Sequence, residues 1–525
     1  MSERPCARAA LLSFSKTDGA LDLARSLERH GYRIYATSGT RGFLEAHGIT
    51  AYDVEDITGF PPLFGGRVKT LHPKIFGAIL YNRADAEHRE QIDRYAIPEI
   101  DVVAVTLYPF EETVARDGTT LAEAIERIDV GGVALLRAAA KNFAHVSVLS
   151  HPAHYAEFAD ALEEGTISPD LRRRWAAAAF ERTAAYDVAI SHYLAAGGTT
   201  SPDAFPGALV LALPMAQRLR YGTNPHARAA FYLDRPERIP EQLHGKMLSY
   251  NNLLDLDATL RLLSRAPLGA EFGSERERFV RAVVVKHTVP CGVAQRSRVG
   301  LAVRDALEAD ALSAYGGILA TDAPLDTEAA EAIAPVFLEI VAAPAFTDDA
   351  LTLLRRKKNL RIMRFDPALP DELARELRVR SALGGVLAEE DDPAAEPERW
   401  RVVSARPPSP QEWHDLAFAW DVVRHVKSNG IVIAKGGTTR GICAGQTNRV
   451  DAVVIAARRA GAHARGAACA SDGFFPFADG LEAAIAAGCA AVIAPGGSIR
   501  DAEVVAAADS AGIALVFSNR RYFLH

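Results

Sequence analysis

The stretch Val283-Val284-Val285-Lys286-His287-Thr288-Val289-Pro290-Cys291-Gly292 indicates the fold class of this chain. Three β-branched residues run into a lysine and a histidine, and a Pro-Cys-Gly breaker follows, so the stretch predicts a buried strand that stops at a tight turn. Polar residues at a strand end lie where open α/β sheets place their ligand crevice. Lys286 offers a fixed positive charge, and His287 can accept and return a proton near neutral pH. The alternative is a solvated lysine and a packed histidine at the start of a loop.

The length and composition bound the class of protein. A chain of 525 residues is too long for one core, so we expect roughly two to four domains. The net charge of −7 argues against a general nucleic-acid binder, so an anionic ligand must be held by local lysines and arginines. The N-terminus lacks a basic segment followed by an apolar core, and no 18-residue apolar run occurs. We therefore expect a cytoplasmic protein that neither enters nor crosses a membrane.

The cysteines point to a reducing compartment. The chain has five of them, an odd number at wide spacing, and no CxxC pair occurs: Cys6, Cys291, Cys443, Cys469 and Cys489. This usage predicts neither a disulfide framework nor a structural zinc site, and we expect no metal.

The first part of the chain alternates strands and helices. Residues 8–14 and 32–36 are expected as strands around a helix at 20–30, which is a βαβ unit and favours a parallel sheet. Ser38, Gly39 and Thr40 follow the second strand. Hydroxyls and a glycine at a strand-to-helix turn suit a phosphate, because free helix N–H groups point at the ligand. The alternative is plain N-capping of the next helix by serine or threonine.

A glycine-rich basic loop follows at residues 65–74. It combines two glycines with Arg67, Lys69, Lys74, the hydroxyl of Thr70 and a histidine, which suits a phosphorylated small molecule. The alternative is an exposed basic turn.

Two charged residues bracket the next strongly helical segment. An apolar strand expected at 102–107 ends at Tyr108, and Asp129 precedes a helical run at 133–140 that Lys141 closes. Asp129 and Lys141 are twelve residues apart and could flank one site if the helix starts there.

Five motifs, in this order, resemble the cyclohydrolase half of the bifunctional purine biosynthesis family: SFSKTDG (13–19), TSGT (37–40), GGRVKTLHPK (65–74), LYPF (107–110) and IDVGGVALLRAAAKN (128–142). That family carries AICAR formyltransferase and IMP cyclohydrolase in one chain. The resemblance implies a methylglyoxal-synthase-like α/β domain that closes the purine ring of formyl-AICAR, with loss of water, to give IMP. By motif position, the residues that line this site are Lys69, Thr70, Tyr108, Asp129 and Lys141, with Arg67, Ser38, Gly39 and Thr40 on the nucleotide phosphate. Lysines can stabilise the developing oxyanion, and an Asp–Lys–Tyr set can move protons.

The second half resembles the formyltransferase part of the same family. The matching motifs are RYGTNPH (220–226), SYNNLLD (249–255), KH (286–287), SAYGG (313–317), EIVAAP (339–344), KSN (427–429), AGQTNR (444–449) and ASDGFFPF (470–477). The resemblance implies two cytidine-deaminase-like subdomains that transfer a formyl group from 10-formyltetrahydrofolate, a reduced folate used as cosubstrate, to AICAR. It also implies a homodimer whose transferase site is built across the interface.

We therefore expect a cyclohydrolase domain at 1–197, a linker at 198–207 and a formyltransferase region at 208–525. The two subdomains are expected at about 208–375 and 376–525, with a strand at 208–213 opening the first.

The resemblance assigns roles in the transfer. His287 handles the proton of the attacking amine, Lys286 protonates the folate nitrogen that leaves, and Asn429 holds the formyl oxygen. The remaining positions bind AICAR or the folate: Arg220, Tyr221, Asn252, Gly317, Glu339, Arg449, Phe474, Asp479, Arg521 and His525. The last two imply a C-terminus that folds back into the site.

The chain departs from the family pattern at three places, one of which is Ala227, where the family commonly has glutamine after Asn-Pro-His. Val289 stands where the family has asparagine, which removes a hydrogen-bonding side chain beside Lys286 and His287. The order of residues around Lys16 is shuffled in the first loop, so its contact with a phosphate is an open question.

Three other classes of protein compare less well with these residues. A zinc deaminase is disfavoured, because Ala294 stands where a second cysteine would follow Cys291 and no His-x-Glu precedes it. A nucleotide-sensing or scaffolding protein with an inactive transferase half gains some support from Val289. A P-loop enzyme is disfavoured, since no G-x-x-x-x-G-K-[ST] occurs.

Overall fold

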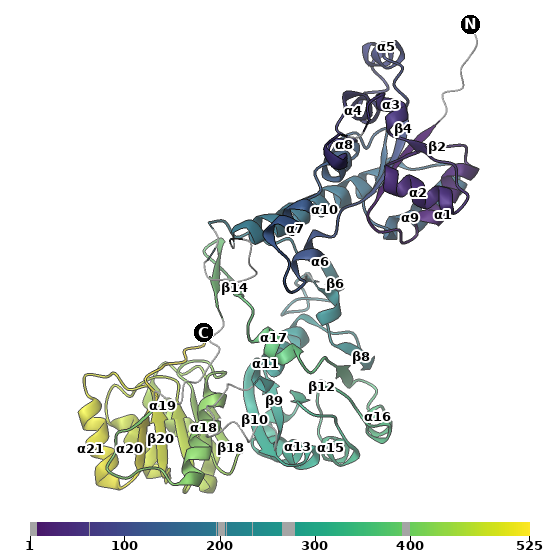
Figure 1. Ribbon diagram of the computed structural model, residues 1–525. Helices are drawn as coiled ribbons and strands as arrows, with labels where there is room; N and C mark the ends of the chain where they lie inside the picture. Colours follow the sequence, from purple (N-terminus) through teal and green to yellow (C-terminus); the bar gives the residue numbers. More distant parts are fainter. Residues whose placement is uncertain are drawn as a thin grey trace. The chain divides into compact units, whose positions relative to one another are not determined.

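The structure is a computed structural model that describes residues 8–61, 63–195, 197, 205, 207–233, 235–264, 279–390 and 400–525. The chain divides into two compact units, Met1–Leu213 and Pro214–His525. The linker expected at 198–207 lies almost entirely outside the described residues. Figure 1 colours the first unit purple to blue and the second teal to yellow.

Unit 1 is built on a five-stranded sheet in the order β3-β2-β1-β4-β5. Its strands are β1 (Ala9–Phe14), β2 (Arg33–Ala36), β3 (Tyr52–Asp53), β4 (Ile100–Thr106) and β5 (Ser147–Leu149). All of the pairings are parallel, which confirms the prediction of a parallel sheet. The central strands are nearly continuous apolar runs because helices cover both faces of the sheet.

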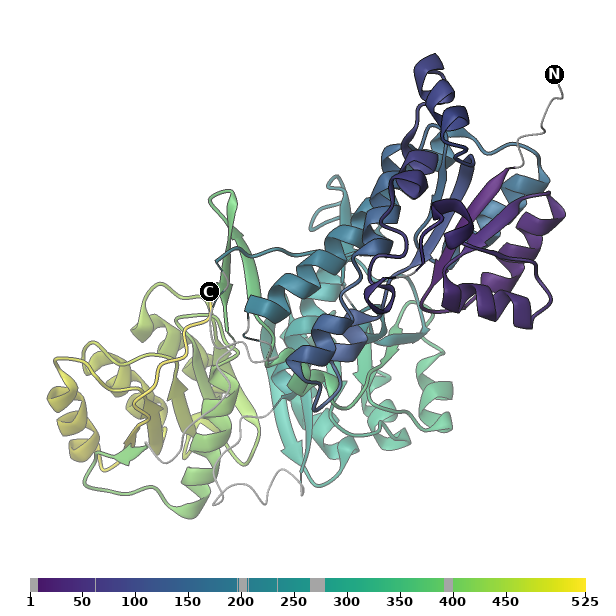
Figure 2. The same cartoon turned by 45° about the horizontal axis from the view of Figure 1, so that its top comes forward.

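The helices of unit 1 form two layers around this sheet (Figure 1). One side carries α1 (Ala20–Arg29), α2 (Ser38–Ala46) and α9 (Ala153–Glu163), and the other carries α4 (Pro73–Leu80), α8 (Gly131–Lys141) and α10 (Pro169–Ala195). Figure 2 shows α10 along its 27 residues. Shorter helices connect them: α3 (Glu55–Thr58), η1 (Phe64–Gly66), α5 (Ala86–Arg94), α6 (Phe110–Val114) and α7 (Leu121–Glu126). Since the strands are parallel, the loops that follow β1, β2 and β4 meet at one edge of the sheet.

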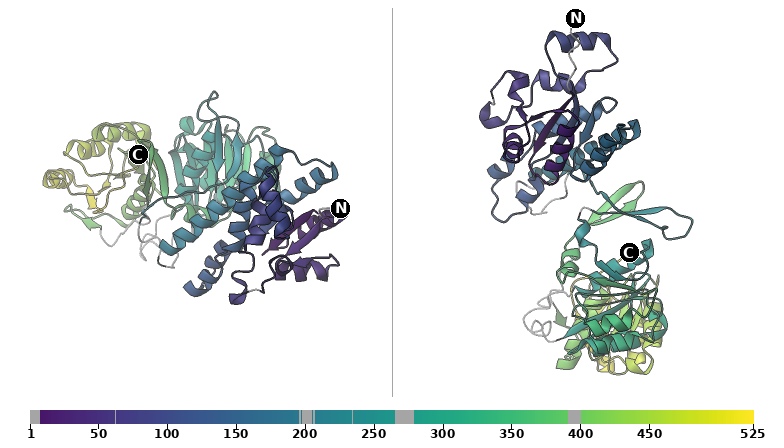
Figure 3. Two further views of the ribbon diagram at one scale, coloured as in Figure 1. Left: turned by 90° about the horizontal axis from the view of Figure 1, so that it is seen from above. Right: turned by 90° about the vertical axis from the view of Figure 1, so that its right-hand side faces the viewer.

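Unit 2 contains two six-stranded sheets with the same topology. Figure 3 shows this unit, coloured teal to yellow, from two further sides. The first has the order β10-β9-β11-β12-β13-β8, and the second has the order β18-β17-β19-β20-β21-β16. In each, three parallel strands are flanked by an antiparallel hairpin on one side and an antiparallel edge strand on the other. The chain order of helices and strands is also the same, so this unit is an internal repeat.

The strands of the first repeat are β8 (Glu241–His244), β9 (Val280–Lys286), β10 (Val289–Arg296), β11 (Ile318–Thr321), β12 (Ile340–Ala343) and β13 (Arg361–Arg364). Those of the second are β16 (Arg401–Val402), β17 (Ile431–Ala434), β18 (Thr439–Cys443), β19 (Ala468–Ser471), β20 (Ala491–Ala494) and β21 (Ala514–Phe517). Two hairpins stand apart from both sheets: β6 (Met215–Leu219) with β7 (Ala229–Tyr232), and β14 (Arg378–Ala382) with β15 (Gly385–Glu389).

One hydrophobic cluster joins the two repeats. It contains side chains from both sheets together with α11 (Tyr250–Leu263) and α18 (Pro410–Val423). The outer face of the first sheet is covered by α13 (Val299–Glu308), α15 (Thr327–Ile333) and α16 (Asp348–Leu354). The outer face of the second is covered by α19 (Arg449–Ala460), α20 (Asp479–Ala487) and α21 (Asp501–Ala511). Short helices complete the unit: η2 (Pro236–Arg238), α14 (Ala311–Ala314), α17 (Leu369–Leu373) and η4 (Gly461–Ala464).

Two details of the predicted strands are wrong. The segment Pro290-Cys291-Gly292 does not end the strand: the chain turns at His287 and Thr288 and returns through these residues as β10. Proline is tolerated there because β10 is an edge strand with a bulge between Pro290 and Gly292. The strand expected at 208–213 is absent from the described structure, because the partner strand β7 pairs with Met215–Leu219 instead.

Candidate functional sites in the two units

The start of α2 in unit 1 is open to a ligand. The hydroxyl of Thr40 accepts the N–H of Phe14 at 2.8 Å, and that of Thr37 lies 3.3 Å from Ser13 Oγ. Thr37, the N-cap residue, makes no side-chain capping bond within the described structure, so the plain N-capping alternative does not hold. Ser38 and Gly39 are exposed. The first N–H groups of α2 therefore remain available to an anion.

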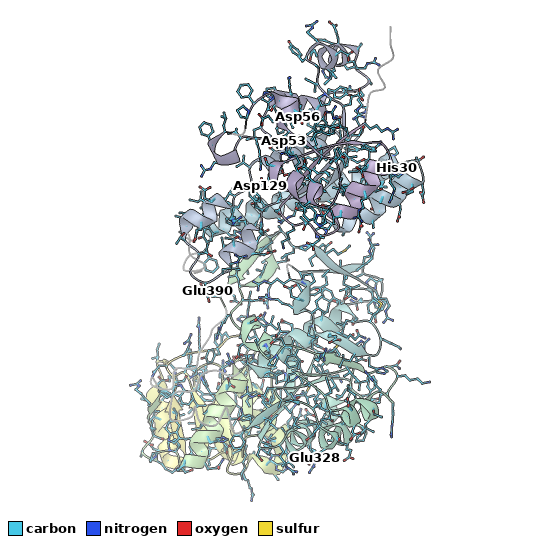
Figure 4. All side chains as sticks on the ribbon, turned by 45° about the vertical axis from the view of Figure 1, so that its right-hand side comes forward. His30, Asp53, Asp56, Asp129, Glu328 and Glu390 are labelled. Carbon is cyan, nitrogen blue, oxygen red and sulfur yellow. The ribbon has the colours of Figure 1, made fainter. Side chains whose placement is uncertain are left out.

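Asp129 and Thr70 lie against the first turn of α8. The N–H of Gly132 donates to Asp129 Oδ1 at 2.7 Å. A Cβ atom at Gly132 would lie 2.5 Å from Asp129 Oδ2, and one at Gly131 would lie 2.8 Å from Thr70 Oγ1. The two glycines are thus required for this close approach. Figure 4 shows Asp129 on its loop.

The environment of Asp129 suits proton transfer. Burial raises the pKa of its carboxyl, against the opposing effects of the Gly132 and Tyr108 N–H groups and the charge of Lys69. The phenol of Tyr186 accepts the N–H of Asp129 at 2.9 Å and donates to Arg127 O at 2.9 Å, which fixes the loop. The structure therefore brings Lys69, Thr70, Tyr108 and Asp129 together.

Other residues expected at this site lie elsewhere in the same chain. Lys141 ends α8, whose 11 residues span about 15 Å, so it lies far from Asp129 at the helix start. Lys141 instead borders an apolar groove of about 660 Å³ beside Phe76 and Phe180. Arg67 is exposed and pairs with Glu126. Lys16 pairs with Glu112.

In unit 2, the sheet register gathers three expected residues. Val285 pairs with Ile318, and Ile318 pairs with Ile340, so Lys286, Gly317 and Glu339 lie at one edge of the first sheet. Lys286 Nζ donates to Tyr315 O at 2.7 Å. Glu339 accepts a hydrogen bond from the buried Arg361 at 2.7 Å. A Cβ atom at Gly317 would lie 2.9 Å from Val285 O, so the close strand approach requires glycine.

The N-terminal part of α11 borders the same edge. The Asn252 side chain accepts the N–H of Ser249 at 3.1 Å in a capping box, which leaves its amide nitrogen for other contacts. Asn251 Nδ2 donates to Thr223 O at 3.2 Å and ties the loop after β6 to this helix. In that loop Arg220 donates to the Tyr221 hydroxyl at 2.7 Å.

Asp255 is a polar residue that the sequence interpretation missed. Its carboxylate accepts the backbone N–H of His287 at 3.2 Å and of Thr288 at 2.7 Å. Burial raises the pKa of this carboxyl, and the two N–H groups oppose the shift. The indication in the sequence was that Asp255 is the last residue of the motif at 249–255.

A second cluster forms at the edge of the second sheet. Asn429 Oδ1 accepts from Arg449 Nη2 at 2.5 Å, and Asn429 Nδ2 donates to Gln446 O at 2.8 Å. Arg449 Nη1 also donates to Asp472 Oδ1 at 2.5 Å. Asp472 is fully buried and also accepts from the Ser428 hydroxyl, so it holds both the residue before Asn429 and the arginine that contacts it. The sequence interpretation did not select Asp472.

The C-terminal residues fold back onto this cluster. The N–H of Tyr522 donates to Asp472 O at 2.9 Å, and the N–H of Ser428 donates to Leu524 O at 2.9 Å. The buried Tyr522 ring packs 5.3 Å from that of Trp420. The C-terminal backbone therefore lies beside Ser428 and Asp472, and the assignment of Arg521 and His525 to the transferase site stays a prediction.

The other residues expected near the second cluster lie on neighbouring segments. Arg521 stacks on Phe523 at 4.8 Å, and the carbonyl of His525 accepts from Arg380 at 2.5 Å. Phe474 follows Asp472 by two residues, and Asp479 begins α20.

Within the described ranges, the helices include none whose length and apolar character would let it cross a bilayer. The same residues hold no group of three side chains suited to bind a metal ion.

Comparison with known proteins identifies the family. Residues 139–459 match the model of the AICARFT/IMPCHase bienzyme, and residues 19–134 match that of the MGS-like domain. The chain belongs to the AICARFT/IMPCHase bienzyme family. It is thus a bifunctional enzyme of purine biosynthesis, with AICAR formyltransferase and IMP cyclohydrolase activities. This result confirms the predicted family, the α/β fold class and the pair of activities.

Members of this bienzyme family resemble the chain over nearly its full length. A protein named "Bifunctional purine biosynthesis protein PurH" from Prochlorococcus marinus (strain MIT 9313) is 46% identical over 98% of this chain and 99% of its own. The protein of the same name from Myxococcus xanthus (strain DK1622) is 46% identical over 98% of this chain and 100% of its own. Among solved structures, "Crystal structure of ForH" is 35% identical and covers 36% of this chain and 98% of its own, with a TM-score of 0.32.

Proposed function

We propose that unit 2 transfers the formyl group of 10-formyltetrahydrofolate to the amine of AICAR, and that unit 1 closes the ring of formyl-AICAR to give IMP and water. One observation carries this division. The proton-transfer groups fall into separate clusters at sheet edges: Lys69, Tyr108 and Asp129 in unit 1, and Lys286 and His287 in unit 2.

The transfer requires three events at the formyl carbon. The amine of AICAR is a poor nucleophile because it is conjugated with a carboxamide, so His287 accepts its proton as the new C–N bond forms. Asn429 donates to the formyl oxygen, which carries negative charge in the tetrahedral intermediate. Lys286, whose ammonium is held 2.7 Å from Tyr315 O, protonates the folate nitrogen as its bond to the formyl carbon breaks.

Further residues of unit 2 hold the two substrates in this proposal. They offer cations, hydrogen-bonding groups and aromatic faces to a phosphate, a ribose, a base and a pterin: Arg220, Tyr221, Asn252, Gly317, Glu339, Arg449, Phe474, Asp479, Arg521 and His525.

The ring closure takes place at the first turn of α8. The amide nitrogen of formyl-AICAR attacks the formyl carbon, and the oxygen leaves as water. Lys69 stabilises the developing oxyanion, while Asp129 and Tyr108 move the protons. The raised pKa of Asp129 supports this role, because a general acid–base group works best when its pKa lies near the working pH. Thr70 and Arg67 hold the substrate, and its phosphate binds at Ser38, Gly39 and Thr40.

Lys141 takes part in this proposal through a second copy of the chain. The length of α8 separates Lys141 from Asp129 in one chain, and the apolar groove that Lys141 borders is a surface that a partner can cover. We therefore expect a homodimer. Mass measurement in solution tests it, and a strictly monomeric species with both activities would contradict it.

The proposed function is tested by two parallel absorbance assays. One uses AICAR with 10-formyltetrahydrofolate, and the other uses formyl-AICAR alone. We expect Lys286→Ala to abolish formyl transfer and leave cyclisation unchanged. Lys435→Ala is a matched control, because Lys435 occupies the corresponding place in the second repeat, where its Nζ donates to Arg465 O at 2.7 Å. Equal loss of both activities in folded Lys286→Ala would contradict the assignment.

One outcome would favour the rival with an inactive transferase half. Val289 begins β10 directly opposite Lys286 in the register, so an apolar side chain lies beside the proposed site. If the wild-type protein converts only formyl-AICAR and Val289→Asn restores transfer, the substitution has inactivated the transferase.

A further inference from the structure

The turn that carries His287 has an unusual sequence for its conformation. Lys286 and Val289 pair across β9 and β10, so the hairpin turns through two residues, His287 and Thr288. Their φ angles are 55° and 60°, the pattern of a type I′ turn. Such turns favour Asn-Gly or Gly-Gly, and a β-branched threonine with positive φ is an outlier. A conformation that the residues themselves disfavour persists only when its surroundings impose it.

The surroundings that impose it come from α11. Asp255 accepts both turn N–H groups, at 3.2 Å from His287 and 2.7 Å from Thr288. Hydrogen bonds to a carboxylate are stronger than neutral ones, and two of them fix the orientation of the peptide plane as well as its position.

The second repeat contains an equivalent aspartate and turn, but glycines occupy the two positions with positive φ, so the turn is not strained. There, Lys435 and Thr438 flank the two-residue turn Gly436–Gly437, whose φ angles are 60° and 64°. Asp415 accepts the N–H of Gly437 at 3.0 Å.

The two aspartates also occupy equivalent helix positions. Each stands six residues after the serine that begins a capping box, Ser249 for Asp255 and Ser409 for Asp415. The comparison of the two repeats shows which features they share and which occur in the first repeat alone. The aspartate–turn arrangement belongs to the repeat, and only the first repeat replaces the two glycines by His287 and Thr288.

We propose that Asp255 is a positioning residue for the formyl transfer, because it holds His287 at the substrate by fixing a turn that His287 and Thr288 disfavour. This inference rests on the proposed role of His287. In this proposal Asp255 acts on the backbone of the turn. A substitution that lets the turn adopt positive φ without strain must therefore make formyl transfer depend less on Asp255.

The test combines two substitutions. Asp255→Ala is expected to lower kcat of the formyl transfer by about 10²-fold, the loss that a displacement of roughly 1 Å causes, with KM for AICAR nearly unchanged. Thr288→Gly alone, which copies the second repeat, is expected to leave kcat within about twofold, since glycine adopts positive φ freely. The double variant is expected to recover at least about tenfold over Asp255→Ala, because the turn then forms without its acceptor.

Two measurements control for folding. Cyclisation of formyl-AICAR in unit 1 must stay at the wild-type rate in every variant. Asp257→Ala, in the same helix but with an exposed carboxylate paired only to Arg261 in the described contacts, is the matched control and must leave transfer unchanged. Hydrogen exchange of the amides in a peptide that spans residues 286–290 gives a readout independent of activity, and we expect faster exchange in Asp255→Ala.

The outcomes are distinguishable. Wild-type kcat in Asp255→Ala, unchanged amide exchange, or a loss that Thr288→Gly does not lessen would each overturn the inference. If the wild type transfers no formyl group, the proposed function fails, and amide exchange alone decides whether Asp255 holds the turn.

Discussion

Gly132→Ala is expected to lower the cyclohydrolase activity of unit 1 while unit 1 stays folded. The added Cβ would lie 2.5 Å from Asp129 Oδ2, 2.9 Å from Asp129 Cγ and 3.0 Å from Asp129 Oδ1, and the first two distances are shorter than real Cβ atoms show. The atoms in the way belong to a short side chain, so the carboxylate can rotate aside without any movement of the helix. The fold therefore tolerates the change, but the carboxylate leaves its position.

The magnitude follows from the contact that is lost. The N–H of Gly132 donates to Asp129 Oδ1 at 2.7 Å. A hydrogen bond to a charged group contributes about 1.5–3 kcal/mol, which corresponds to about a ten- to a hundredfold loss if it holds the carboxylate in its reactive place. Alanine in a helix is favoured over glycine by at most about 1 kcal/mol, which offsets only part of the lost hydrogen bond, so the free energy of unfolding should fall by at most about 2 kcal/mol and unit 1 should stay folded.

The assay follows the conversion of formyl-AICAR to IMP, with formyl transfer in unit 2 as the internal reference. Gly42→Ala is the matched control, because Gly42 also lies within a helix and a Cβ there would meet no described heavy atom within 4 Å. Gly132→Ala with cyclisation within twofold of Gly42→Ala would refute the reasoning, and so would parallel loss of both activities.

Three further predictions concern unit 2. Asp421→Asn should lower its free energy of unfolding by about 3–5 kcal/mol in urea denaturation, because it leaves Arg281, bonded to Asp421 at 2.6 Å and 1% exposed, without its buried partner. Burial depresses the pKa of His425 well below its ordinary value of about 6.5. The unfolded chain therefore binds a proton that the native state does not, and the free energy of unfolding should fall as the pH drops below about 6.5, a slope that His425→Leu should remove. Tyr522→Ala should abolish formyl transfer while cyclisation persists, because the C-terminal residues lose their packing 5.3 Å from Trp420, and tryptophan fluorescence should report the release.

Each of these has a contrary result. Glu503→Ala breaks an exposed pair with Arg500 at 3.5 Å in the same unit and should lower the free energy of unfolding by less than about 1 kcal/mol, so a loss equal to that of Asp421→Asn would show that burial does not determine the size of the effect. A pH slope that persists in His425→Leu would assign it to other groups. Full transfer in Tyr522→Ala would show that the folded-back terminus is not needed.

The local features of the fold could be predicted because they depend on short-range patterns. The apolar runs at β1 and β4 and the helical spacing of α1 give the parallel sheet of unit 1, since each element buries one face or both. The motifs at 65–74 and 128–142 give the residues of the candidate cyclohydrolase site, because the loops after parallel strands converge at one edge.

The positions of turns and partners were less predictable. Pro290-Cys291-Gly292 reads as a breaker, yet it forms part of an edge strand, because the turn was set two residues earlier by an acceptor on a distant helix. The sequence predicted a strand at 208–213, whereas the strand that pairs with β7 is Met215–Leu219, because the register of a hairpin depends on its partner strand.

Residue types and their order were enough to predict the α/β class, the family and the set of polar residues at the strand ends. Which of these residues meet became clear from the folded chain. The tertiary structure separated Lys141 from Asp129 by the length of a helix, joined Asp472 to Ser428 and Arg449, and brought Asp255 to the turn at His287. The physical reason is that these contacts join residues 23 to 44 positions apart or fix the ends of a rigid helix, so they depend on packing that no local pattern encodes.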